Sequence, residues 1–145
     1  MDPAHAQLKA VVALAQDVAK ELGKGRSEAV YQKALGVALQ AAGIQHVMEE
    51  TITIFYCGQA VGQERIDLTL HGFIDAVVEL KAVAKLKTDD VWQLQKYMHS
   101  KKVRYGILLN FSQTPGQPLG ICVLVGDHQY NFETFALTDL PSAAF

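Results

Sequence analysis

Residues 77–83 read Val77-Val78-Glu79-Leu80-Lys81-Ala82-Val83, an apolar run that carries two opposite charges two positions apart. In a β-strand the side chains alternate between the two faces, so Glu79 and Lys81 project from the same face. Burying either charge is costly unless the charge is paired, hydrated or bound to a metal. The stretch therefore predicts a buried strand that carries a polar site on one face.

A second alternating stretch, residues 65–70, places Asp67 twelve residues before Glu79. If the two stretches form neighbouring strands of a hairpin, the carboxylates of Asp67 and Glu79 lie side by side. A hard cation such as Mg²⁺ binds one or two carboxylates together with water and phosphate oxygens. Lys81 could then orient or deprotonate the attacking water, or offset charge on a scissile phosphate. The alternative is a cross-strand ion pair at a sheet edge, and this pattern of an Asp followed by Glu-x-Lys often recurs by chance.

The periodicity of apolar residues predicts the order of the elements along the chain. Helices are expected at residues 3–22 and 27–42, each followed by a glycine. Strands are expected at 51–56, 60–63, 66–70, 74–83 and 104–111, with a helix from Thr88, as its cap, to about Ser100, and a closing hairpin of 119–125 and 129–135. A mixed α/β sheet flanked by helices accommodates this order.

The composition is that of an ordinary globular domain, and we expect one domain over residues 1–145. The net charge of −2 gives no global basic footprint for nucleic acid. Cys57 and Cys122 are too few for a disulfide framework and are expected to be reduced in a cytoplasmic protein. No stretch approaches the roughly 18 uncharged residues of a membrane span, so no membrane partner is expected.

The predicted helix after the charged strand carries Gln93 and Tyr97, four positions apart and therefore on one face. Facing the Glu79 strand, they would be suited to position a phosphate or the metal ligands. The alternative is an ordinary amphipathic helix with Val91, Leu94 and Met98 inward and Gln93 in solvent.

Several ordered motifs connect these features to a known family. They are Gly25-Arg26-Ser27-Glu28-Ala29-Val30-Tyr31, then Arg65-Ile66-Asp67-Leu68, Val78-Glu79-Leu80-Lys81-Ala82, Gln93-Leu94 with Tyr97, and Gly106-Ile107-Leu108-Leu109-Asn110-Phe111. Over roughly residues 5 to 125 the chain resembles the small bacterial GxxExxY proteins, a branch of the PD-(D/E)xK, restriction-endonuclease-like nuclease superfamily.

The resemblance implies a restriction-endonuclease-like αβββαβ core in a mixed sheet, here with an extra N-terminal helix and a C-terminal hairpin. It also implies a Mg²⁺- or Mn²⁺-dependent site with Asp67, Glu79 and Glu28 as metal ligands and Lys81 as the catalytic lysine. Gln93 and Tyr97 resemble the Q-x-x-x-Y element of the related recombination-type exonucleases. Without the resemblance, Glu28 would be interpreted as a solvated acid at a helix start.

The departures from the family pattern leave the implied site complete. Asp75 adds an acid to the Glu79 strand, either in water at its start or beside the site. Lys96 stands where the family commonly has an asparagine, and residues 119–145 are poorly covered.

A local basic patch offers a surface for nucleic acid. Residues 81–104 contain seven basic residues and two acids, and the candidate phosphate contacts are Lys85, Lys87, Lys96, Lys101 and Lys102. The alternative is a solvated helix end whose lysines complement the helix dipole.

These features favour a divalent-metal-dependent nuclease, acting on DNA rather than RNA. A catalytically weak nuclease-fold protein that acts as a nucleic-acid-binding or assembly module, as a homodimer or with a protein partner, is the alternative. A nuclease held by a partner, as in host-defence systems, is a third hypothesis.

Overall fold

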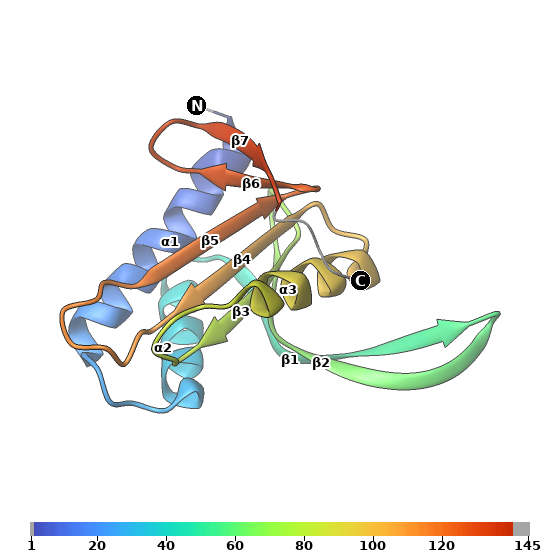
Figure 1. Ribbon diagram of the computed structural model, residues 1–145, viewed down its shortest axis with the longest axis horizontal. Coiled ribbons are helices and arrows are strands. Elements are labelled where there is room, and N and C mark those ends of the chain that lie inside the picture. Colours follow the sequence, from blue (N-terminus) through green and yellow to red (C-terminus); the bar gives the residue numbers. More distant parts are fainter. Residues whose placement is uncertain (1, 141–145) are drawn as a thin grey trace.

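The computed structural model describes residues 2–140, and these contain three helices and seven strands (Figure 1). The elements are α1 (Pro3–Leu22), α2 (Glu28–Ala41), β1 (Gln45–Tyr56), β2 (Gln59–His71), β3 (Ala76–Lys81), α3 (Thr88–Lys101), β4 (Tyr105–Asn110), β5 (Gly120–Val125), β6 (His128–Asn131) and β7 (Ala136–Asp139). The predicted single domain extends to residue 145, and its last five residues lie outside the described range.

All seven strands form one sheet in the order β1-β2-β3-β4-β5-β6-β7. Neighbouring strands pair antiparallel except β3 and β4, which pair parallel and are joined by a crossover through α3. The predicted αβββαβ core is therefore confirmed as α2-β1-β2-β3-α3-β4 in a mixed sheet, preceded by α1.

The two faces of β3 face different helices. Ala76, Val78 and Leu80 pack in the cluster formed with α1 and α2, whereas Val77 packs in the cluster formed with α3. Because side chains alternate along a strand, Glu79 and Lys81 lie on the α3 face with Val77. The charged side chains of the opening stretch therefore lie between the sheet and α3.

Strands β1 and β2 are longer and more continuous than predicted. The start of β1 is hidden in the sequence because residues 45–50 are largely polar, yet His46 to Met48 pair with Leu70 to Leu68. The predicted break in β2 at Glu64-Arg65 is absent, because both residues pair with β1. Strand β3 begins at Ala76 rather than at residue 74.

The prediction of one strand over residues 129–135 is wrong. Strand β6 ends at Asn131, whose Oδ1 accepts hydrogen bonds from Glu133 N (2.8 Å) and Thr134 N (3.2 Å). This Asx-type turn reverses the chain into β7, so the C-terminal part is a three-stranded meander. The cap of α3 also differs by one residue: Lys87 is the N-cap, and Thr88 begins the helix.

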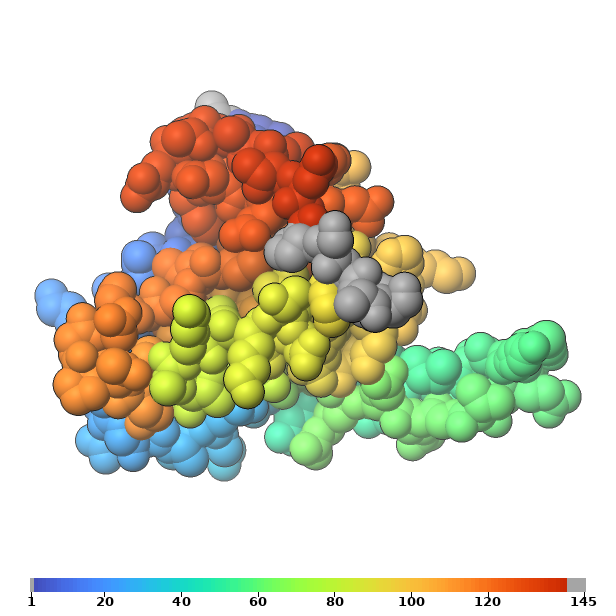
Figure 2. All heavy atoms as spheres, in the orientation of Figure 1, coloured from blue at the N-terminus to red at the C-terminus, as the bar shows by residue number. Residues whose placement is uncertain are grey.

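The distal parts of β1 and β2 project from the body as a two-stranded arm, residues 51–63 (Figures 1 and 2). Strand β3 pairs with β2 only at Leu68 to Leu70, so neither edge of the arm has a neighbour among the described strands. Cys57 and Gly58, with φ of 48° and 76°, form its tip, the combination that a tight hairpin turn needs. Among residues 2–140, no helix is long and apolar enough to cross a membrane.

Candidate functional site

The side chains of Asp67 and Glu79 form hydrogen bonds across the end of the β2–β3 ladder. Leu68 and Val78 are the last paired residues, so Asp67 and Glu79 come next on their strands. Asp67 N donates to Glu79 Oε2 (3.0 Å), and Leu80 N donates to Asp67 Oδ2 (2.9 Å). Each carboxylate thus replaces a missing backbone partner on the opposite strand and is held in a fixed position.

Glu79 is a buried acid, with 4% of its surface exposed. Burial, together with the hydrogen bond and the negative charge of the adjacent Asp67 side chain, raises the pKa of Glu79 to about 9. The positive charge of Lys81 lowers that pKa but does not offset the burial. In the protein alone, Glu79 therefore holds a proton at neutral pH. A bound cation could replace this proton and balance the negative charge of the two carboxylates.

Lys81 reaches from β3 toward the start of α3. Its Nζ lies 3.9 Å from Asp90 Oδ1, and the lysine side chain is 27% exposed. The other oxygen of Asp90 accepts a hydrogen bond from Lys87 N (2.9 Å) and so caps the helix. The contact between Asp90 and Lys81 could not be predicted from the sequence, because nothing in their spacing indicates it.

Glu28 enters the same group from α2, where Ser27 is the N-cap and Glu28 the first helical residue. Partial burial of its carboxyl group, followed by the negative charge of Asp67, raises the pKa of Glu28, and Lys81 opposes the shift. Gln32, one turn later, donates from Nε2 to the carbonyl oxygen of Asp67 (2.6 Å). The structure thus brings Glu28 close enough to interact electrostatically with both Asp67 and Lys81. The hydrogen bond of Gln32 links α2 to β2.

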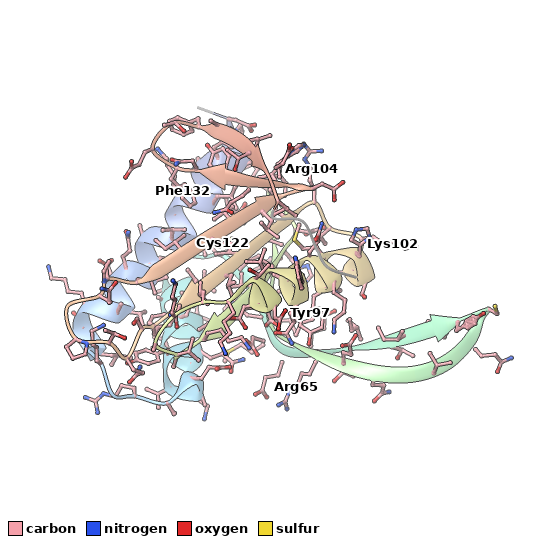
Figure 3. The ribbon with its side chains drawn as sticks, viewed as in Figure 1. Arg65, Tyr97, Lys102, Arg104, Cys122 and Phe132 are labelled. Carbon is pink, nitrogen blue, oxygen red and sulfur yellow. The ribbon has the colours of Figure 1, made fainter. Side chains whose placement is uncertain are left out.

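Gln93 and Tyr97 face the site from α3. Gln93 Nε2 donates to Tyr97 Oη (3.3 Å), and the Tyr97 ring is 5% exposed. Burial first, and then the negative charge of Glu79, raise the pKa of Tyr97. Figure 3 shows Tyr97 between α3 and the base of the arm, with Arg65 on β2 below it. Gln93 is half-buried rather than fully solvated.

The five candidate phosphate-binding lysines fall into two groups. Lys96 Nζ bonds Glu64 Oε2 (2.7 Å) and lies 5.1 Å from the centre of the Tyr97 ring, and Lys101 forms an ion pair with Glu50. Lys85, Lys87 and Lys102 are exposed and form no ion pair within residues 2–140. The second group is the one whose charge is available to a ligand.

Asp75, the extra acid of the sequence pattern, is not part of this group. It lies before β3, its side chain is 63% exposed, and its Oδ1 is 3.6 Å from His71 Nδ1. The first of the two alternatives, an acid in water at the strand's start, describes it.

The described residues contain no group of three or more His, Cys, Asp or Glu side chains that is already arranged to hold a metal ion. The donors that do converge are carboxyl oxygens of Asp67 and Glu79, with Glu28 nearby. A buried carboxyl that retains its proton beside a second carboxyl offers the oxygen ligands that a hard divalent cation prefers. Such an ion commonly completes its coordination shell with water and phosphate oxygens. The residues present fit such an ion.

Comparison with known proteins agrees with the fold. The crystal structure of SSO0001 superposes with a TM-score of 0.54 at 17% identity, covering 74% of this chain and 54% of that one, so this chain spans about half of that protein. A search of curated proteins returns no significant match. Residues 5–119 match the family described as the PD-(D/E)XK nuclease superfamily. The chain therefore belongs to the PD-(D/E)XK nuclease superfamily.

Proposed function

We propose that the protein is a divalent-metal-dependent nuclease that hydrolyses phosphodiester bonds, in DNA rather than RNA. The observation that supports this most directly is that Asp67 and Glu79 are held side by side by hydrogen bonds. Lys81 lies two residues after Glu79, on the same face of the strand. A structural ion pair would join Glu79 to Lys81, whereas here Glu79 pairs with another acid and Lys81 lies near Asp90.

In this proposal Asp67, Glu79 and Glu28 hold Mg²⁺ or Mn²⁺. The bound ion would supply Lewis acidity at the scissile phosphate. Lys81 orients the attacking water or accepts its proton, and its positive charge offsets the charge that develops on the phosphate. The Gln93–Tyr97 pair borders the buried side of Glu79 and positions the reacting groups.

The deciding experiment compares wild type with Lys81→Ala and Asp67→Asn on matched DNA and RNA substrates, in Mg²⁺, Mn²⁺ or EDTA. We expect each substitution to reduce cleavage by roughly 100-fold or more, as removal of one electrostatic contact to a transition state commonly does, and EDTA to abolish it. Asp75→Asn is the matched control, because Asp75 precedes the same strand but is exposed. Cleavage that resists EDTA and both substitutions would refute the proposal.

The second candidate function is a nucleic-acid-binding or assembly module with little catalysis. The Lys81–Asp90 contact favours it, because a lysine near a carboxylate has less charge to offer a phosphate. Titration of the protein with Mn²⁺ by calorimetry separates the two functions. Binding that Asp67→Asn removes supports the nuclease, and no binding by the wild type supports the module.

A homodimer or another protein partner is best supported by the arm. Residues 51–63 carry no charged side chain, and Phe55, Tyr56 and Val61 are each more than 60% exposed. Lysines and prolines, which commonly protect an edge strand, are missing from this segment. Identical uncharged strands can pair without charge repulsion, so we propose that a second copy binds here. Sedimentation of wild type and Val61→Lys tests it, and a monomer at all concentrations would exclude the dimer.

We also propose a cytoplasmic location. Both cysteines are free, Cys57 exposed at the tip of the arm and Cys122 buried in β5. Unpaired thiols of this kind are compatible with a reducing compartment. Localisation of a tagged full chain by cell fractionation checks this directly.

A further inference from the structure

A short segment that begins at the last residue of β4, residues 110–117, contacts the chain that follows β3. We call it the clasp. Asn110 pairs with both backbone groups of Val83, accepting from its N (3.0 Å) and donating to its O (3.1 Å). Phe111 N donates to Lys81 O (2.8 Å). The path of the backbone at Lys81 and just beyond is therefore set by the clasp.

The clasp also holds the loop that precedes Glu28. Lys24 Nζ donates to the carbonyl oxygens of Ser112 and Gln117, both at 2.7 Å. Gly25 N donates to Gln113 Oε1 (2.9 Å), and Gly25 has a φ of +91°, which a glycine adopts readily. One segment thus contacts both chains that carry charged groups into the site: the chain after Lys81, 27 residues away in sequence at Val83, and the loop before Glu28, 88 to 93 residues away.

Tyr31 locks the same loop from within. Its ring is 1% exposed and stacks on Phe111 of the clasp, with centroids 4.4 Å apart and planes 9° apart. Its hydroxyl donates to Gly23 O (2.6 Å) and accepts from Arg26 N (3.4 Å). A phenylalanine could make the same stack, so the specific contribution of the tyrosine hydroxyl is its two hydrogen bonds to the loop. Those contacts fix residues 23–26 against the helix on which Glu28 is the first residue.

We propose that Tyr31 is a positioning residue of the site: through Gly23 and Arg26 it sets the start of α2 and so delivers the Glu28 carboxylate to Asp67. This inference rests on the proposed function for its consequence, which is metal affinity. The long side chain of Glu28 is exposed and has no hydrogen bond of its own within the described residues, so its location depends on where the helix begins.

The test uses Tyr31→Phe, with Tyr130→Phe as its matched control. Tyr130 is also buried, at 4% exposure, but its hydroxyl has no hydrogen-bond partner within residues 2–140. We expect Tyr31→Phe to keep the circular dichroism spectrum of the wild type and to weaken Mn²⁺ binding about tenfold by calorimetry, the equivalent of losing one modest interaction. Tyr130→Phe should leave the Mn²⁺ affinity unchanged.

A double-variant cycle with Glu28→Gln distinguishes positioning from a general structural role. If Tyr31 acts through Glu28, Tyr31→Phe weakens Mn²⁺ binding in the wild type but not in the Glu28→Gln protein. A merely structural role would weaken binding equally in both backgrounds. Equal losses, or an unchanged affinity in Tyr31→Phe, would overturn the proposal.

A second measurement separates this proposal from the proposed function. ¹⁵N relaxation reports the order of the backbone amides of Gly25, Arg26 and Glu28 in the absence of metal. If the wild type binds no Mn²⁺ and cuts no nucleic acid, the nuclease proposal fails, and the amides alone decide the role of Tyr31. Increased motion in Tyr31→Phe and not in Tyr130→Phe then supports positioning, and unchanged motion rejects it.

Discussion

At the scale of single residues, the notable pairing is that of two acids rather than of an acid and a base. Glu79 accepts from the backbone of Asp67, and its burial and the Asp67 carboxylate favour the protonated form. A buried acid with a raised pKa weakens the fold when it ionises. Ionisation of Glu79 in the folded protein is therefore unfavourable, and a bound cation would offset that cost.

This cost predicts how stability depends on pH. Because the folded state raises the pKa of Glu79 from 4.5 to about 9, the unfolded chain loses this proton first, and the free energy of unfolding falls as pH rises through that window. We expect Glu79→Gln to remove this component and to be more stable than wild type at the alkaline end. Urea unfolding without metal, across pH 4.5 to about 9, measures both effects.

Glu21→Gln, at the exposed end of α1, is the control for this experiment and should keep the slope of the wild type. Saturating Mn²⁺ should stabilise the wild type most at the alkaline end of the window, since the ion competes with the proton. Identical pH slopes for wild type and Glu79→Gln would contradict the assigned environment of Glu79.

At the scale of elements, the position of α3 decides whether Gln93 and Tyr97 reach the site. The helix packs on β4 at Gly106, where an added Cβ would collide with Met98 Sδ and lie 3.0 Å from two atoms of Leu94. The missing side chain lets the helix approach the sheet closely. This close approach buries the side chains of Tyr97 and Met98 against the sheet.

Gly106→Ala is therefore expected to destabilise the fold by about 1–3 kcal/mol, the usual cost of overpacking a core. Trp92, the single tryptophan, lies on α3, so its fluorescence should report the displacement of the helix. Gly62→Ala is the matched control, because a Cβ there meets no atom within 4 Å. Equal stabilities of the two variants would show that α3 does not depend on Gly106.

At the scale of the whole molecule, charge is distributed unevenly. The chain has a net charge of −2, yet Lys85 and Lys87 lie in the loop between β3 and α3 and form no ion pair with any residue from 2 to 140. Lys101 lies in the same part of the sequence but is neutralised by Glu50. A nucleic acid should therefore contact Lys85 and Lys87 in the loop rather than Lys101 on the helix.

The salt dependence of nucleic-acid affinity should consequently arise largely from Lys85 and Lys87 in this loop. Replacing Lys85 and Lys87 together by alanine should lower the slope of log affinity against log salt concentration by about 2, roughly one for each lost phosphate contact. Lys101→Ala should leave the slope unchanged. Fluorescence anisotropy at several salt concentrations measures this, with Lys20→Ala on α1 as control. A slope that changes equally in all three proteins would argue against a localised contact.

The sequence predicts the charged strands well and the supports of the site poorly. Asp67, Glu79 and Lys81 interrupt apolar alternation, so their shared face follows from strand geometry. Their roles in catalysis stay predictions. The contacts of Gln32 and Asn110 could not be predicted, because their partners are backbone groups 35 and 27 residues away. Peptide groups leave no mark in a sequence pattern.

The same limit applied to the elements. The first half of β1 was missed because its polar residues lack strand periodicity, although pairing with β2 makes it a strand. The turn at Asn131 was missed because the residues around it look equally suited to an extended chain, and it is the side chain of Asn131 that reverses the direction. Local composition favoured one conformation, and specific partners selected another.

The single parallel ladder among the described strands has a consequence in time as well as in space. On one side of it, β1, β2 and β3 pair with strands that are next to them in the chain, and on the other side β4 to β7 do the same. Each half can form from nearby contacts, whereas β3 and β4 meet only after the chain between them has closed a long crossover, which is slow. Glu79 and Lys81 stand on one side of this seam and the clasp on the other. We therefore expect the two halves to acquire their shape first during folding and the site to form when they join.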